Sequence, residues 1–214
     1  MTGHPPVPGH DATRRSYDTV AGRYAETFRN ELDHKPLDRA LLGVVLEETG
    51  AGATVADLGC GPGHVAAWLA DLGAKSVGID LSEAMVDTGR REFPQVEFRH
   101  GDLLALPATD DEFDAVVCFY SIIHLRGEEV GAAFAEMRRV LEAPGPLLVA
   151  FHVGAEVRHR DEWWGQEVEL DFRFFDMDDV VAAMEGAGFR VAARLQREHY
   201  PDEVDTVRGY VLAR

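Results

Sequence analysis

The chain has 214 residues, of which 46% are hydrophobic and 28% charged, a length and composition typical of one soluble globular domain. Its 38 acidic and 21 basic residues give a formal net charge of -17, which repels nucleic-acid phosphates and anionic lipid. Two cysteines are too few for a disulfide framework, and no apolar run is long enough for a membrane span or a signal peptide. We therefore expect a cytoplasmic protein with no nucleic-acid partner and no membrane partner.

Two predicted segments precede the first strand. Residues 1–12 are rich in Pro, Gly and His, so we expect a flexible tail there, followed by a single domain over 13–214. Within 13–46, apolar residues such as Tyr17, Val20, Tyr24 and Leu41 recur at three- and four-residue spacing. This spacing predicts an N-terminal cap made of helices.

Strands and helices then alternate along the chain. We predict strands at 54–58, 76–79, 96–99, 115–120 and 146–152, with helices at 65–72, 83–92 and 129–141 between them. Short apolar strands that alternate with helices predict a doubly wound, Rossmann-like α/β fold whose sheet is mostly parallel and has helices on both faces. A helix at 178–187 and strands at 190–197 and 206–212 complete a sheet of seven strands.

The segment 153–177 is an insertion that this minimal fold does not need. Its second part alternates polar and apolar residues from Glu167 to Phe175, which predicts an exposed strand or hairpin. Two interpretations are open. The segment is an edge ribbon whose aromatic residues fill the core, or it is a lid whose aromatic residues form an apolar pocket over the ligand crevice.

A glycine-rich turn follows the first strand. Gly59, Gly61 and Gly63 stand at alternate positions, which lets the backbone turn sharply into a helix and approach a ligand closely. The helix directs its free N–H groups and the positive end of its dipole to the same place. Asp80 ends the next strand, where a carboxylate can accept hydrogen bonds from a ribose diol.

Four elements together resemble the motifs of class I S-adenosylmethionine (SAM) dependent methyltransferases. They are the turn Asp57-Leu58-Gly59-Cys60-Gly61-Pro62-Gly63, the strand-end Asp80, the run Gly101-Asp102-Leu103 and the strand Phe113-Asp114-Ala115-Val116-Val117-Cys118. The resemblance extends from Tyr17 to the C-terminus. It implies a sheet with an antiparallel last strand, SAM as the cofactor and a small molecule as the methyl acceptor.

The resemblance also implies how the cofactor is bound. The backbone of Gly59 and Gly61 would contact the amino-acid end, and Asp57 would orient its ammonium group. Asp80 would hold the ribose, and Asp102 the adenine amino group. The remaining expected cofactor-binding residues are Leu81 and Leu103 on either side of the adenine, the capping Tyr17 and Tyr24, and Cys60, Gly63 and Phe119. The alternative is structural: the carboxylates cap strand ends and the two tyrosines pack in the core.

Two histidines are the candidate catalytic residues. His124 follows the fourth strand and His152 ends the fifth, at the sheet edge where doubly wound folds build their sites. Either could remove a proton from the methyl acceptor. The alternative for His124 is a structural role in positioning its loop. No group of residues has metal-ligand spacing, so we expect no metal.

Two other functions remain open. Gly61-Pro62-Gly63-His64-Val65-Ala66 formally matches the dinucleotide pattern of a NAD(P)-dependent oxidoreductase, although two helices precede it and Gly101-Asp102 would then have no role. The fold could also serve as a non-catalytic scaffold that binds SAM.

Overall fold

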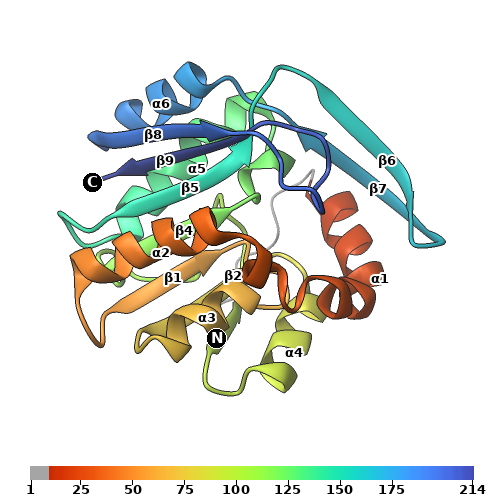
Figure 1. Ribbon diagram of the computed structural model, residues 1–214, viewed down its shortest axis with the longest axis horizontal. Coiled ribbons are helices and arrows are strands. Elements are labelled where there is room, and N and C mark those ends of the chain that lie inside the picture. Colours follow the sequence, from red (N-terminus) through yellow and green to blue (C-terminus); the bar gives the residue numbers. More distant parts are fainter. Residues whose placement is uncertain (1–9) are drawn as a thin grey trace.

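The computed structural model describes residues 10–214, and a seven-stranded sheet forms its centre (Figure 1). The strand order is β3-β2-β1-β4-β5-β9-β8. Their bounds are β1 Thr54–Leu58, β2 Lys75–Asp80, β3 Glu97–His100, β4 Ala115–Phe119, β5 Leu147–His152, β8 Val191–Arg197 and β9 Arg208–Ala213. The first five strands pair in parallel, and β9 lies antiparallel between β5 and β8. The predicted Rossmann-like sheet with its antiparallel last strand is confirmed.

Helices cover both faces of the sheet (Figure 1). Their bounds are α1 Asp11–Phe28, α2 Pro36–Thr49, α3 His64–Asp71, α4 Glu83–Glu92, α5 Gly127–Val140 and α6 Met177–Gly186, with short 3₁₀ turns at Glu31–His34 (η1) and Ile122–His124 (η2). Successive residues of β1 point to opposite faces. Val55 packs in a cluster with Leu42 of α2 and Leu69 of α3. Ala56 joins the cluster that contains Phe134 of α5.

The N-terminal cap begins earlier than its predicted boundary. Helix α1 starts at Asp11, and the preceding His10 is only 7% exposed. The prediction of a flexible tail over 1–12 is therefore wrong for its last three residues, while its first nine lie outside the described residues. The reason is a tertiary contact, because the side chain of His10 bonds to carboxylates far away in the sequence.

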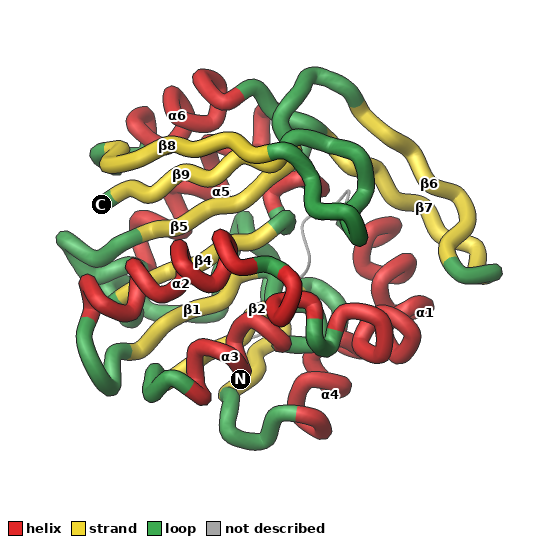
Figure 2. The backbone as a smooth tube through the Cα atoms, in the orientation of Figure 1, coloured by secondary structure: helices red, strands yellow, loops and turns green. Residues whose placement is uncertain are grey.

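The insertion forms a two-stranded antiparallel hairpin of β6 (Val157–Trp163) and β7 (Gln166–Arg173), as the alternation predicted. Its turn is at Trp164 and Gly165, which both have positive φ, the backbone conformation of a tight type I′ connection. Figure 2 shows the hairpin apart from the central sheet and beside α1.

The hairpin is joined to α1 by apolar and polar contacts. Val168 and Leu170 of β7 pack against Val20 of α1. The hydroxyl of Ser16 accepts a hydrogen bond from the N–H of Glu169 at 2.8 Å and lies 3.2 Å from the carbonyl oxygen of the same residue. Helix α1 and the hairpin therefore form one connected layer over the edge of the sheet.

Candidate active site

The glycine turn after β1 needs glycine for two separate steric reasons. Gly59 has a φ of +69°, and a Cβ at this position would lie 1.9 Å from the hydroxyl oxygen of Ser121. A Cβ on Gly63, where φ is +90°, would lie 2.4 Å from the ring of Phe98. Gly59 thus lets the loop after β4 approach, and Gly63 lets α3 pack on β3.

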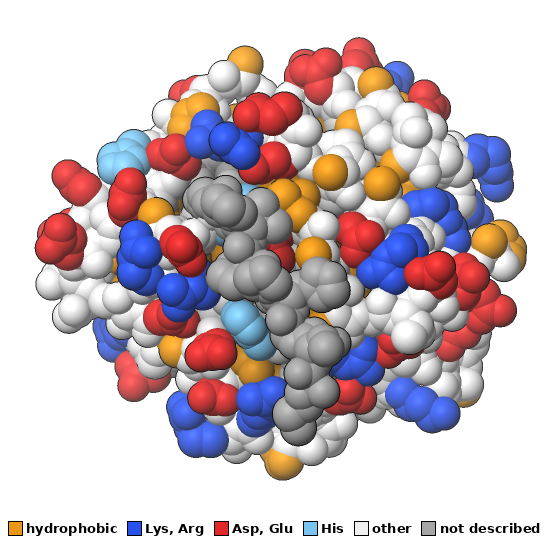
Figure 3. Space-filling model, turned by 180° about the vertical axis from the view of Figure 1, so that it is seen from behind, with side chains coloured by type: hydrophobic (Ala, Val, Ile, Leu, Met, Phe, Trp, Pro, Cys, Tyr) orange, Lys and Arg blue, Asp and Glu red, His pale blue; other side chains and the backbone are white. Residues whose placement is uncertain are grey.

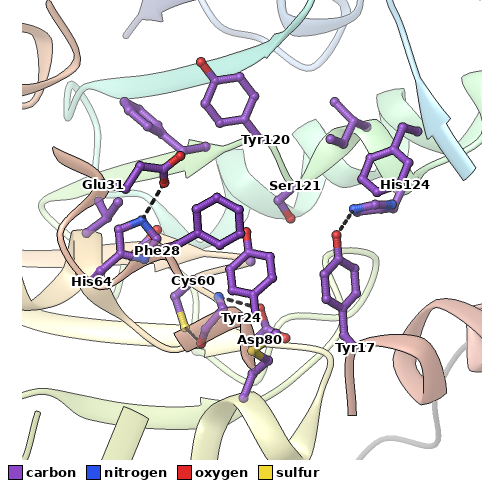
Figure 4. A pocket seen from close by; sticks show the side chains of 18 of the residues that line it. Tyr17, Tyr24, Phe28, Glu31, Cys60, His64, Asp80, Tyr120, Ser121 and His124 are labelled. Atoms are coloured by element: carbon purple, nitrogen blue, oxygen red, sulfur yellow. Dashed lines mark hydrogen bonds and ion pairs between the residues drawn. The ribbon is translucent and has the colours of Figure 1, made fainter. Parts of the chain in front are cut away.

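A cavity of about 760 Å³ lies at the carboxyl ends of the central strands. It contains nearly all the residues that the sequence predicted for the site, and Figure 4 shows part of its lining. The predicted residues that line it are Tyr17, Tyr24, Asp57, Gly59, Cys60, Gly61, Asp80, Leu81, Asp102, Leu103, Phe119, His124 and His152. Gly63 lies outside this lining and acts on the packing of α3 instead.

Asp57 and Asp80 both accept hydrogen bonds from backbone N–H groups beside the glycine turn. A carboxylate oxygen of Asp57 accepts from the N–H of Ala66 at 3.1 Å, and burial raises the pKa of Asp57 to about 7. The two oxygens of Asp80 accept from the N–H of Gly61 at 2.7 Å and of Ser82 at 2.8 Å. Burial also raises the pKa of Asp80. Both carboxylates therefore stabilise the loops from which the cavity is built.

Asp102 has a partner that the sequence did not suggest. One of its oxygens is 2.8 Å from Nδ1 of His10, and the other accepts from the N–H of Leu104. Nε2 of His10 faces Glu129 at 3.5 Å. A carboxylate faces each ring nitrogen, so only the protonated imidazole can donate to both. The hydrogen bond to Asp102 raises the pKa of His10.

His124 is held between the cap helix and the hairpin. Its Nδ1 lies 3.0 Å from the carbonyl oxygen of Asp171, which can only accept, so Nδ1 carries the proton. Burial lowers the pKa of His124 to about 4, so the ring is neutral at pH 7. Its Nε2 therefore accepts the hydrogen bond from the hydroxyl of Tyr17 at 2.7 Å (Figure 4).

His152 has a different environment. Its ring stacks on Phe174 at 5.1 Å, and its Nδ1 lies 2.9 Å from the hydroxyl of Thr206. Burial lowers the pKa of His152 to about 3, and the positive charge of Arg208 lowers it further. This leaves a neutral ring with Nε2 available on a residue that lines the cavity.

Aromatic side chains from the cap and the hairpin meet at one wall of the cavity. Tyr24 lies 4.4 Å from Phe28 and 5.8 Å from Trp163, measured between ring centroids. Trp163 in turn lies 6.2 Å from Tyr17 and stacks on Trp164 at 4.6 Å. Phe28, Trp163 and Phe172 line the cavity with the two predicted tyrosines.

A second polar group in the lining joins His64, which follows the glycine turn, to charged residues from segments that carry no recognisable motif. Glu31 of η1 lies 2.6 Å from the ammonium group of Lys35 and 3.1 Å from Nε2 of His64. Lys35 also lies 3.0 Å from Glu203, in the loop between β8 and β9. Sequence reasoning missed these residues because each looks like an ordinary surface charge until the fold brings them together.

Two kinds of feature are absent from the described chain. Across residues 10–214, no group of three or more His, Cys, Asp or Glu side chains is arranged to hold a metal ion. No helix in this range is long and apolar enough to cross a membrane.

Comparison with known proteins identifies the family. Residues 55–145 match the family described as a methyltransferase domain. A probable S-adenosylmethionine-dependent methyltransferase of Mycolicibacterium smegmatis is 34% identical over 162 residues, which cover 70% of this chain and 61% of that protein. A demethylmenaquinone methyltransferase of Renibacterium salmoninarum is 34% identical over 142 residues, 65% of this chain and 58% of that protein. The chain thus spans about three fifths of the length of these relatives.

A solved structure shows the same fold. Magnesium protoporphyrin IX methyltransferase of Synechocystis, crystallised with SAM, aligns with a TM-score of 0.72 over 98% of this chain and 99% of its own, at 18% identity. Three observations agree on the family. They are the match of the domain family, the similarity to the curated relatives, and the motif residues gathered around one cavity. Residues 55–145 thus match a methyltransferase domain, and the relatives support a place for this chain among the class I SAM-dependent methyltransferases, a family whose cofactor is SAM.

Proposed function

We propose that this protein transfers the methyl group of SAM to a small, neutral or cationic acceptor with an apolar part. The observation that carries this proposal is the single cavity in which the family's motif residues meet side chains from the cap, the hairpin and the loop before β9. Carboxylates outnumber Lys and Arg in its lining, and this acidic surrounding favours a cationic ligand such as the sulfonium of SAM over an anion. The basic residues of the lining are Lys35 and Arg208, and the acidic residues are Glu31, Asp38, Asp57, Asp80, Asp102, Asp202 and Glu203.

The adenosine half of the cofactor would lie where Asp80 and Asp102 reach the cavity. Asp80 would accept from the ribose hydroxyls and Asp102 from the adenine amino group, since a carboxylate has about four lone-pair sites and each of these two already uses two of them. Leu81 and Leu103 would contact the ring. SAM supplies an activated methyl group on its sulfonium sulfur, so the protein has mainly to align the acceptor and exclude water.

The two histidines would contribute as neutral groups, which do not repel a sulfonium. Both ring nitrogens of His124 already have partners, Tyr17 and Asp171, so we assign it to positioning the cap and the hairpin around the reacting atoms. His152 keeps Nε2 for the acceptor. We therefore place the acceptor's polar group beside His152, which would orient it or take its proton.

The aromatic wall favours the lid interpretation of the hairpin. Trp163 and Phe172 come from the hairpin, and Tyr24 and Phe28 come from α1. All four line the cavity, where they would bind the apolar part of the acceptor and keep water away from the methyl group. The relative that acts on demethylmenaquinone has an acceptor of this general kind, a small molecule.

The charge of the chain supports the same choice of acceptor class. On the face shown in Figure 3, acidic and basic side chains are interspersed, and no broad basic surface is present among its described residues. Such a face gives a nucleic acid little to bind. The cytoplasmic location remains a prediction, in agreement with two buried, free cysteines.

Calorimetric titration with S-adenosylhomocysteine (SAH), run beside NAD, tests the proposal. We expect saturable binding of SAH alone. Binding of NAD alone would favour the oxidoreductase reading. If SAH binds, a panel of small acceptors assayed for SAH production distinguishes an enzyme from a scaffold that only binds the cofactor.

A further inference from the structure

The short turn η1, between α1 and α2, places a charged side chain in the cavity wall. The carboxylate of Glu31 lines the cavity and is 26% exposed. Burial alone would raise its pKa, but the neighbouring His64 and Lys35 outweigh burial and hold the pKa of Glu31 at about 2. Glu31 is therefore fully ionised at neutral pH, and the cavity can reach it.

His64 connects Glu31 to the glycine turn. It is the first residue of α3 and directly follows Gly63, and its Nε2 lies 3.1 Å from Glu31. Its other ring nitrogen, Nδ1, is buried and has no hydrogen-bond partner within residues 10–214. Figure 4 shows Glu31 and His64 pointing toward each other, on the opposite side of the drawn residues from Tyr17 and His124.

Asp57, the residue expected to orient the cofactor's ammonium group, is less suited to that task. Only 2% of its surface is exposed, and one of its oxygens already accepts from Ala66. With a pKa raised to about 7, it is only partly ionised at neutral pH. A positive group at the turn would gain more from the accessible carboxylate of Glu31.

We propose that Glu31 binds the α-ammonium group at the amino-acid end of the cofactor, and that His64 orients the Glu31 carboxylate for this contact. The proposal rests on the SAM-binding function proposed above. A carboxylate offers about four lone-pair sites, so the contacts with Lys35 and His64 leave room for a further donor. Glu31 is then a cofactor-binding residue that contacts one end of the cofactor only, and His64 is the positioning residue.

The test compares two ligands that differ only in that end. SAH carries the amino-acid group, and 5′-methylthioadenosine keeps the adenosine and the thioether but lacks it. In calorimetric titrations, Glu31→Gln should weaken SAH binding about ten- to a hundredfold and leave binding of 5′-methylthioadenosine unchanged. Asp80→Asn, at the ribose end, should weaken both ligands by similar factors.

Two controls separate this proposal from its alternatives. Glu26→Gln removes an exposed carboxylate of α1, so it should change neither affinity. If Glu31→Gln fails to fold, Glu31→Asp keeps the charge on a shorter side chain and should still weaken SAH selectively. Equal weakening of both ligands by the Glu31 variant, or no change in either, would overturn the assignment of Glu31. Failure of the parent protein to bind either ligand would instead overturn the proposed SAM-binding function.

Discussion

Replacing His10 with glutamine removes a positive charge from between two carboxylates. The imidazole donates to Asp102 at 2.8 Å and faces Glu129 at 3.5 Å, and all three side chains are buried. A hydrogen bond to a charged group contributes about 1.5–3 kcal/mol, whereas a neutral one contributes about 0.5–1.5 kcal/mol. Since glutamine can keep a neutral donor near Asp102, we expect His10→Gln to lower the free energy of unfolding by about 1–2 kcal/mol at neutral pH or below.

The pH dependence of this loss gives the sharper test. The pKa of His10 is raised in the folded protein, so its contribution is complete below the unfolded value of 6.5 and declines as pH rises through the folded pKa. The pKa of His124 is lowered to about 4, so its contribution to the free energy of unfolding rises with pH up to about 6.5. Above pH 6.5 this contribution no longer changes with pH. Asp57, with a pKa raised to about 7, also titrates nearby, but it does so in both proteins.

Urea unfolding followed by circular dichroism at about pH 6 and about pH 9 measures the difference. The difference in the free energy of unfolding between wild type and His10→Gln should be larger at the lower pH and smaller at the higher one. His34→Gln, which removes an exposed histidine, serves as the matched control and should give no gap at either pH. An unchanged gap at both pH values would refute the charged state of His10.

Three further predictions concern the cavity and its loops. Asp80→Ala should weaken SAH binding about tenfold or more, because each charge-assisted hydrogen bond to the ribose contributes about 1.5–3 kcal/mol; unchanged affinity in titration would exclude the ribose contact. Tyr17→Phe removes the hydrogen bond to His124, so we expect turnover to fall while SAH affinity changes little. Equal losses of turnover and of SAH affinity would indicate that Tyr17 contacts the cofactor directly. Gly63→Ala should cost about 2–4 kcal/mol of unfolding free energy, from positive φ and overlap with Phe98. Gly22→Ala, with open space around it, should cost nothing.

Local sequence was sufficient to predict the sheet and to place the motif residues at one edge of it. The period of the apolar residues indicates strand or helix, and short strands that alternate with helices leave few topologies other than a doubly wound sheet. The turn from Asp57 to Gly63 and the strand-end Asp80 lie near one another because β1 and β2 are adjacent and parallel. Their place at one sheet edge therefore follows from the order of the elements alone.

The cap, the hairpin and the polar groups that complete the cavity were decided by tertiary structure. His10 and Asp102 are 92 residues apart in the sequence, Glu31 and His64 are 33 apart, and Ser16 and Glu169 are 153 apart. Contacts between residues so far apart in the sequence leave no periodic pattern in it. Each of these residues, seen alone, resembles an ordinary polar residue of a surface or of a flexible end. Sequence thus determined where the glycine turn after β1 is built, while long-range packing decided which side chains surround it and how they are charged.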